Sequence, residues 1–199
     1  MTSRLSAEIA AAAARLVVEE GLEYGQAKRR AARDLGAGDG RKLDLPSNDE
    51  LEEEVRSYIE LFCADSQPQE LRALRELALT WMERLAEFRP HLTGAVWRGT
   101  ATRLSDIHLQ LFCDDAKSAE LALIDRGVNY HVGAMNGPRN EKIDVLSIPA
   151  KCPSLGDTVT VHLSILDHDD MRGALKADGQ GRSPRGGIAA LRGLLEGES

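Results

Sequence analysis

Two side chains that can bind a metal ion, Asp106 and His108, lie two positions apart in the sequence. Between residues 106 and 112, polar side chains alternate with apolar ones, which is the pattern of a half-buried β-strand. Alternate side chains of a strand point to the same face, so Asp106 and His108 share one face. We therefore expect this polar face to look into a cleft or into water.

A glycine-bounded segment precedes this strand. Residues 94–99 (GAVWRG) begin and end on glycine, which lets the backbone come close to a ligand or to a neighbouring strand at either end. The sequence predicts that 94–112 forms a pair of strands, with a turn that runs from Arg98 to Ser105.

The glycine turn, an Arg-Gly pair and the sequence Ser-Asp-Ile-His-Leu follow one another at a defined spacing. This arrangement resembles the signature of the nucleotidyltransferase superfamily, of the minimal, polymerase-beta-like type, over residues 70–150. The matching residues are Gly94, Arg98, Gly99, Ser105, Asp106, Ile107 and Leu109. The motif is degenerate at two chemical positions, because the family's serine is Ala95 here and its second aspartate is His108.

The resemblance implies a site in which two carboxylates on one strand and a third on a neighbouring strand hold two magnesium ions. Asp144, in the predicted strand 142–148, is the candidate for the third carboxylate. The implied catalytic and metal-binding residues are Asp106, His108 and Asp144, and the implied phosphate-binding residues are Gly94, Ala95, Arg98 and Gly99.

The two departures weaken the magnesium chemistry that the resemblance implies. Magnesium prefers hard oxygen ligands, whereas an imidazole such as that of His108 suits manganese or zinc better. Ala95 lacks the hydroxyl that would help to hold a phosphate. Each candidate also has a purely structural interpretation: Asp106 as the cap of a turn, His108 as an exposed side chain, and Asp144 as a surface residue of an edge strand.

Helical and strand patterns surround this stretch and predict an α+β fold, with a mixed sheet, helices packed on one side and a helical N-terminal part. Helices are expected before the sheet and at 116–125 and 188–195, and further strands at 128–132, 142–148 and 158–166. The residues expected in the core are Leu71, Leu74, Met82, Leu85, Phe88, Val96, Leu109 and Leu111. We expect a helical extension over 1–65 and the α+β domain over 66–199.

The N-terminal part contains a basic segment. Helices are predicted from Ser6 to Gly21 and from Tyr24 to Leu35, and a capping box, Ser47 with Glu50, opens a third. The second helix carries Lys28, Arg29, Arg30 and Arg33, a candidate surface for nucleic acid or a protein partner. A DNA-reading helix-turn-helix fits the apolar spacing poorly, so a packed helix pair with a solvated basic face is favoured. Loops are expected at 36–46 and 179–187, and a short helix at 167–175.

Composition narrows the classes of function. The formal net charge of −7 argues against a protein coated for nucleic acid, and no apolar run approaches the length of a membrane span. Three cysteines without metal-ligand spacing indicate buried thiols, and we expect a cytoplasmic location.

Three functions follow from these observations. First is a degenerate transferase-like protein that binds a nucleotide or RNA through the cleft and Arg98, Arg103 and Arg139 without efficient catalysis. Second is an active transferase that uses Mn²⁺ or Mg²⁺ at a variant Asp/His/Asp site. Third is a protein-interaction module that acts through the N-terminal helices.

Overall fold

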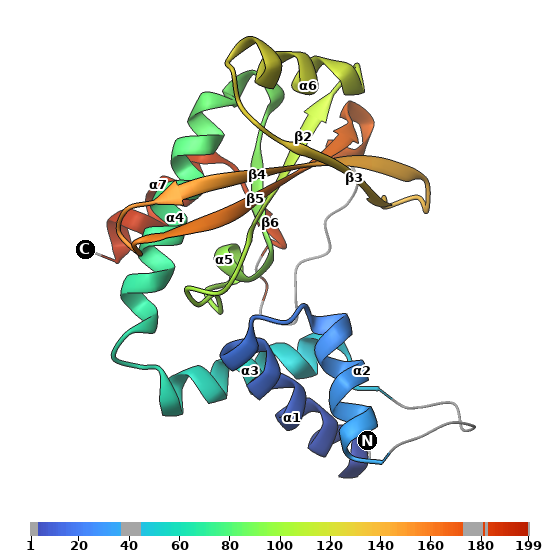
Figure 1. Cartoon of the computed structure of the whole chain (residues 1–199), viewed down its shortest axis with the longest axis vertical. Helices are drawn as coiled ribbons and strands as arrows, with labels where there is room; N and C mark the ends of the chain where they lie inside the picture. Colours follow the sequence, from blue (N-terminus) through green and yellow to red (C-terminus); the bar gives the residue numbers. More distant parts are fainter. Residues whose placement is uncertain (1–3, 37–44, 173–180, 182, 199) are drawn as a thin grey trace. The chain divides into compact units, whose positions relative to one another are not determined.

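The computed structural model describes residues 4–36, 45–172, 181 and 183–198 (Figure 1). The chain divides into two compact units, Met1–Pro68 and Gln69–Ser199. No helix among the described residues has both the length and the apolar character needed to cross a membrane.

Three helices make up the described part of the first unit: α1 (Arg4–Glu20), α2 (Tyr24–Asp34) and α3 (Asn48–Phe62). Helix α1 packs against both others through small and β-branched side chains, among them Ile9, Ala13, Ala27 and Val55. The predicted capping box is confirmed, because the Ser47 hydroxyl accepts from the Glu50 amide and the Glu50 carboxylate accepts from the Ser47 amide. The loop expected at 36–46 lies mostly outside the described residues.

The second unit is built on a mixed sheet, so the predicted α+β class is confirmed. In the described residues the strand order is β3-β4-β5-β2-β1-β6, and only the β2–β5 pair is parallel. The elements are α4 (Gln67–Arg84), η1 (Ala86–Phe88), β1 (His91–Thr93), α5 (Gly94–Arg98), β2 (Ile107–Cys113), α6 (Ala116–Asp125), β3 (His131–Asn136), β4 (Lys142–Cys152), β5 (Asp157–Asp167), η2 (His168–Arg172), β6 (Arg185–Gly186) and α7 (Ile188–Gly197).

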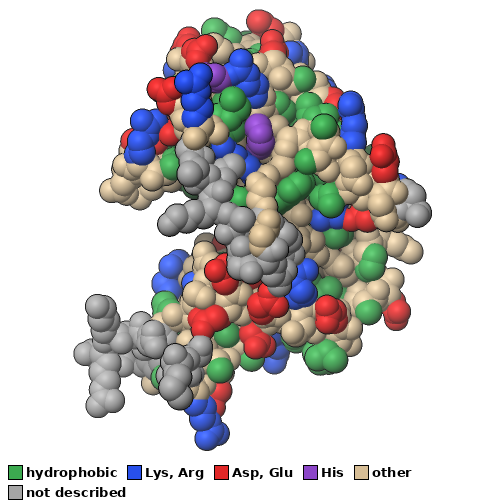
Figure 2. Space-filling view, turned by 180° about the vertical axis from the view of Figure 1, so that it is seen from behind, with side chains coloured by type: hydrophobic (Ala, Val, Ile, Leu, Met, Phe, Trp, Pro, Cys, Tyr) green, Lys and Arg blue, Asp and Glu red, His purple; other side chains and the backbone are tan. Residues whose placement is uncertain are grey.

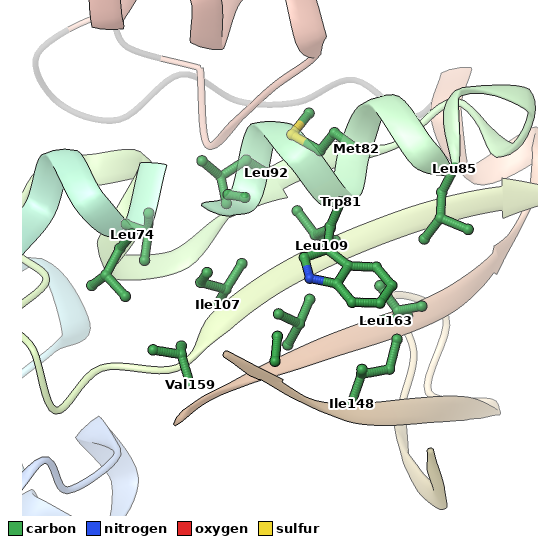
Figure 3. Close-up of a cluster of buried hydrophobic side chains, with 14 of the residues drawn as sticks. Leu74, Trp81, Met82, Leu85, Leu92, Ile107, Leu109, Ile148, Val159 and Leu163 are labelled. Atoms are coloured by element: carbon green, nitrogen blue, oxygen red, sulfur yellow. The ribbon is translucent and has the colours of Figure 1, made fainter. Parts of the chain in front are cut away.

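The core of this unit lies between the sheet and helices α4, α6 and α7. Figure 3 shows Trp81 of α4, and Leu85 directly after it, lying over apolar side chains of the strands. The expected core residues are confirmed: Leu71, Leu74, Met82, Leu85, Val96, Leu109 and Leu111 are buried, and Phe88 is partly buried against them. The alternation of β2 therefore places Ile107, Leu109 and Leu111 toward the helices, and Asp106 and His108 toward the other face.

The prediction that 94–112 forms a strand pair is wrong in its first half. Residues Gly94–Arg98 form the short helix α5, and the strand that pairs with β2 is β1, which ends at Thr93. Glycines explain the break, because Gly94 and Gly99 have φ values of 74° and 92° that other residues rarely adopt. The Arg75 guanidinium, in addition, donates to the Val96 and Trp97 carbonyls at the end of α5.

Two further element boundaries differ from the sequence prediction. The strand expected at 128–132 begins at His131 and continues to Asn136, because α6 is closed by Gly127 in a left-handed conformation and an extended connection follows. The short helix expected at 167–175 is the 3-10 helix η2 as far as Arg172, and its last residues lie outside the described part of the chain.

Candidate functional site

A row of polar side chains crosses the sheet on the face opposite the helices. The strand register places His131 of β3 beside Ser147 of β4, Ser147 beside His162 of β5, and His162 beside His108 of β2. Cross-strand partners point to the same face, so the register alone gathers three imidazoles and a hydroxyl into one line. The row continues to Thr93, which is in register with His108, and ends at Arg185, which is in register with Thr93.

Three of the polar groups on this face are linked by hydrogen bonds. The Ser147 Oγ lies 2.8 Å from His162 Nδ1, and His162 Nε2 lies 3.0 Å from Asp106 Oδ2. The side chains of His162 and Asp106 are 24% and 39% exposed, so solvent reaches the pair. The His108 ring stacks on the His162 ring, with centroids 4.9 Å apart and an interplanar angle of 20°. Both rings are therefore held in place, one by hydrogen bonds and the other by contact with it.

The glycine turn predicted to bind phosphate lies against this group. A Cβ placed on Gly94 would lie 3.5 Å from the Cδ2 atom of His108, so the turn and the imidazole are in close contact. Ala95 and Arg98 follow in α5 and are half-buried, and Gly99 ends the helix. The structure thus brings together three of the residues expected from the sequence: Gly94, Asp106 and His108.

Asp144 does not belong to this group, and the expectation of a convergent Asp106, His108 and Asp144 site is wrong. Strand β4 pairs with β3 and β5, so β5 separates Asp144 from β2. Ser147 is in the row with His108, and Asp144 is three positions from Ser147, so it points to the helix side of the sheet. There it contributes to the environment of Lys117 on α6, whose pKa is raised chiefly by the hydrogen bond that its ammonium donates to Glu120 and less by the Asp144 charge.

On β5, the strand that neighbours β2, the side chain bonded to Asp106 is the imidazole of His162. In the described ranges, no three or more His, Cys, Asp or Glu side chains are arranged so that they could hold a metal ion. The other donors near Asp106 are imidazoles and a hydroxyl. Magnesium prefers several oxygen ligands to an imidazole or to a single carboxylate. The residues present do not fit a two-magnesium centre.

Most of the arginines expected to contact a ligand are paired within the protein. Arg103 lies 3.9 Å from Asp157 and its amide donates to Glu70, while Arg139 forms a 2.8 Å ion pair with Asp170. Both guanidinium side chains remain largely exposed. On the side shown in Figure 2, described basic and acidic side chains are interspersed.

The basic residues of α2 are also divided between two roles. The Lys28 ammonium donates to the Pro46 carbonyl and to Asn48, which ties α2 to the start of α3. Arg30 pairs with Glu20 of α1. Arg29 and Arg33, one helical turn apart, are exposed and remain the candidates for contact with a partner.

Sequence reasoning missed Ser147 and His162. Alternation over residues 158–165 does place His162 on a polar face, but nothing in the sequence shows that β5 lies beside β2 rather than at the sheet edge. The sequence separation of 56 between Asp106 and His162 also conceals their pairing.

Comparison with known proteins gives only distant structural likenesses. No protein-family model and no curated protein matches the sequence. A structure of the Cid1 poly(U) polymerase with the UTP analogue UMPNPP aligns at 14% identity with a TM-score of 0.36, covering 55% of this chain and 36% of that one. A cytoplasmic RNA terminal U-transferase aligns at 17% identity with a TM-score of 0.37, covering 60% and 39%. The chain spans less than two fifths of the length of those proteins, and likenesses at these scores assign neither a family nor a function.

Proposed function

We propose that the face around Asp106, His108 and His162 binds a nucleotide or RNA and does not support efficient magnesium-dependent nucleotidyl transfer. One observation supports this proposal: the Gly94 turn, Asp106, His108 and His162 lie together, and the group bonded to Asp106 from the neighbouring strand is an imidazole rather than a carboxylate. Such a group offers hydrogen bonds and stacking surfaces to a ligand, and few of the oxygen ligands that two magnesium ions require.

The ligand class follows from the groups on this face. Imidazole edges, a hydroxyl and a half-exposed carboxylate can exchange hydrogen bonds with the edges of a nucleobase, and bases also stack on imidazole rings. The nearby Gly94 backbone can approach a ligand closely because no side chain intervenes. Recognition of a base therefore fits these groups best.

An active transferase that uses Asp106, His108 and Asp144 together requires side chains on opposite faces of the sheet to meet. The two proposals therefore differ in what they expect of Asp144. If this face binds the ligand, Asp144→Asn leaves binding unchanged and Asp106→Asn weakens it.

The test is titration of each nucleoside triphosphate, and of short single-stranded RNAs, into the whole protein in EDTA, Mg²⁺ and Mn²⁺. We expect saturable binding that survives EDTA, weakens in Asp106→Asn and His108→Ala, and is unchanged in Asp144→Asn. In parallel, incorporation of nucleotide into RNA should be at background with Mg²⁺. Robust Mg²⁺-dependent incorporation that Asp106→Ala abolishes would contradict the proposal, and so would an absence of binding to every nucleotide and RNA.

A protein partner for the N-terminal helices is the second candidate function. Leu61 and Phe62 at the end of α3 are 75% and 68% exposed, and Phe62 packs its ring only against Tyr58 among the described aromatic residues. Exposed apolar side chains next to each other are typical of a contact surface. A Leu61→Ser, Phe62→Ser variant that folds normally but loses a partner while keeping nucleotide binding would separate this function from the first.

A further inference from the structure

The binding proposal uses the carboxylate of Asp106 and the imidazole of His162. It gives no role to the hydrogen bonds that link Ser147, His162 and Asp106. Its three members come from β4, β5 and the residue just before β2, and the two bonds measure 2.8 and 3.0 Å. The two bonds use both nitrogens of one imidazole. Such a chain fixes the ring's orientation and its tautomer together.

The tautomer follows from the partners. An ionised carboxylate can only accept hydrogen bonds, so the Nε2 atom of His162 carries the proton that it donates to Asp106. The Nδ1 atom of the neutral ring then has a free lone pair, and the Ser147 hydroxyl donates to it. This is the arrangement in which an imidazole can remove the proton of a serine while a carboxylate stabilises the imidazolium that forms.

We propose that Ser147 is a nucleophile activated by His162, with Asp106 as the positioning residue, and that it accepts an acyl group from an uncharged ester. The Ser147 Oγ would attack the ester carbonyl carbon as its proton moves to His162 Nδ1. The new oxygen–carbon bond forms, the bond to the leaving alcohol breaks, and the alcohol oxygen takes the proton from His162. Water would then attack the acyl carbon as its proton moves to His162 Nδ1. The bond to Ser147 Oγ breaks, Oγ takes that proton, and the acid leaves.

The charge of the surroundings selects an uncharged substrate. On this face, two rows of cross-strand partners flank the row that contains Ser147. One of them contains Gly133, Val145, Ser164 and Gln110, and the other contains Pro149, Thr160 and Asp106. These strand positions carry no lysine or arginine, and the guanidinium of Arg185, which lies beyond Thr93 in the Ser147 row, donates to Gln110. An anionic ester would meet the Asp106 charge beside His162. A carbonyl ester develops a single negative charge at its oxygen. His131, in register with Ser147 on its other side, is placed to donate to that oxygen.

Ser164 provides a matched control on the same face. It lies on β5, two residues from His162, is half-buried like Ser147, and donates its hydroxyl to the weak acceptor Sδ of Met135 at 3.6 Å. No imidazole bonds to it among the described residues, so exposure and strand environment are matched while activation is not.

The experiment treats the whole protein with para-nitrophenyl acetate and, separately, with an alkyl fluorophosphonate, and maps the modified residue by mass spectrometry. We expect a burst of nitrophenolate stoichiometric with protein and a single adduct on Ser147. The burst rate should fall roughly 100-fold or more in Ser147→Ala and His162→Gln, the range that loss of an activating base typically causes. Ser164→Ala should react like the unaltered protein.

The positioning role of Asp106 is tested by a measurement that would not change if Asp106 only stabilised the fold. Heteronuclear NMR of the imidazole nitrogens should show the His162 proton on Nε2 in the unaltered protein, and on Nδ1 in Asp106→Asn if the amide donates to Nε2. The burst should slow in that variant, while its far-UV circular dichroism spectrum and its melting temperature stay unchanged.

Three results would overturn the proposal: adducts spread over several serines, an adduct rate equal to that of the unfolded chain, or a His162→Gln variant that reacts as fast as the unaltered protein. Because neither reagent is a nucleotide, these outcomes are independent of whether the face binds nucleotide or RNA.

Discussion

The indole of Trp97 lies directly against Gly186, and its Nε1–H donates to the Ser183 carbonyl at 2.8 Å. The last residues of α5 thereby hold the short strand β6 at the edge of the sheet. A Cβ on Gly186 would overlap the ring, so glycine is required there by space rather than by backbone conformation.

Gly186→Ala should therefore displace Trp97 and destabilise the protein by about 1–3 kcal/mol, the usual cost of overpacking. Denaturant unfolding monitored by tryptophan fluorescence measures this loss. Gly193→Ala is the control: nothing lies within 4 Å of an added Cβ there, and alanine favours the helix α7. Equal unfolding midpoints for the two variants would contradict the packing described.

Arg75 should be far less tolerant of substitution than its ion-pair partner Glu198. The guanidinium is 5% exposed and satisfies the carbonyls of Val96 and Trp97 as well as the Glu198 carboxylate. Burial lowers the pKa of Arg75, which the nearby Glu198 charge partly offsets. Arg75→Met leaves buried carbonyls unpaired, at about 1–3 kcal/mol for each group.

Glu198→Gln keeps the two carbonyl contacts of Arg75 and removes only a partly exposed charge, so its effect should be small. Thermal and denaturant unfolding of the two variants compare them directly. If Glu198→Gln cost as much as Arg75→Met, the ion pair rather than the carbonyl contacts would hold α5.

Leu85→Ala should cost about 2–5 kcal/mol of unfolding free energy, because Leu85, the residue after α4, is fully buried in the core. The matched variant is Leu121→Ala on α6, where the side chain is 57% exposed and the change should stay within about 0.5 kcal/mol. Chemical denaturation of both variants tests the comparison. An unchanged midpoint for Leu85→Ala would contradict the packing of the end of α4 in the core.

Cys113 should be an unreactive thiol at neutral pH. Burial, with smaller contributions from the charges of Asp114 and Asp115, raises the pKa of Cys113 to about 11 from an ordinary 9.0. Alkylation by iodoacetamide should be slower at Cys113 than at the less buried Cys63, and the difference should vanish in denaturant.

The direction in which the unfolding free energy changes with pH follows from the same raised pKa of Cys113. Between about pH 9 and 11 the folded state keeps the Cys113 proton that the unfolded chain releases. The stabilisation by the neutral thiol is therefore complete below pH 9 and is lost as the pH rises toward 11. A Cys113→Ala variant should show a weaker decline in unfolding free energy over this range.

Periodicity was enough to predict the α+β class and the buried residues of α4 and β2, because apolar spacing reports which side of an element is covered. The capping box of Ser47 and Glu50 was predictable from residue type and spacing alone, because its hydrogen bonds are local. These features depend on residues close together in the chain.

Features that depend on distant pairings were not predictable in the same way. Helix α5 has an apolar sequence that suits a strand, and contacts from Arg75 and Gly186 accompany its helical form. Asp144 was expected beside His108 because strand order is invisible in periodicity, and the order places β5 between them. The same order supplied His162 to the site, a residue that had no partner in its own segment.

The parallel pairing of β2 with β5 also bears on how the protein folds. Strands β3, β4 and β5 are joined by short connections and can pair antiparallel as a local meander, whereas β2 meets β5 only after the whole of that meander has been passed. The contact between His162 and Asp106 spans 56 residues. Closing that loop has an entropic cost, so we expect the contact to form late in folding. Formation of that hydrogen bond would thus report the end of folding: a chain with helices and hairpin in place would still have no site.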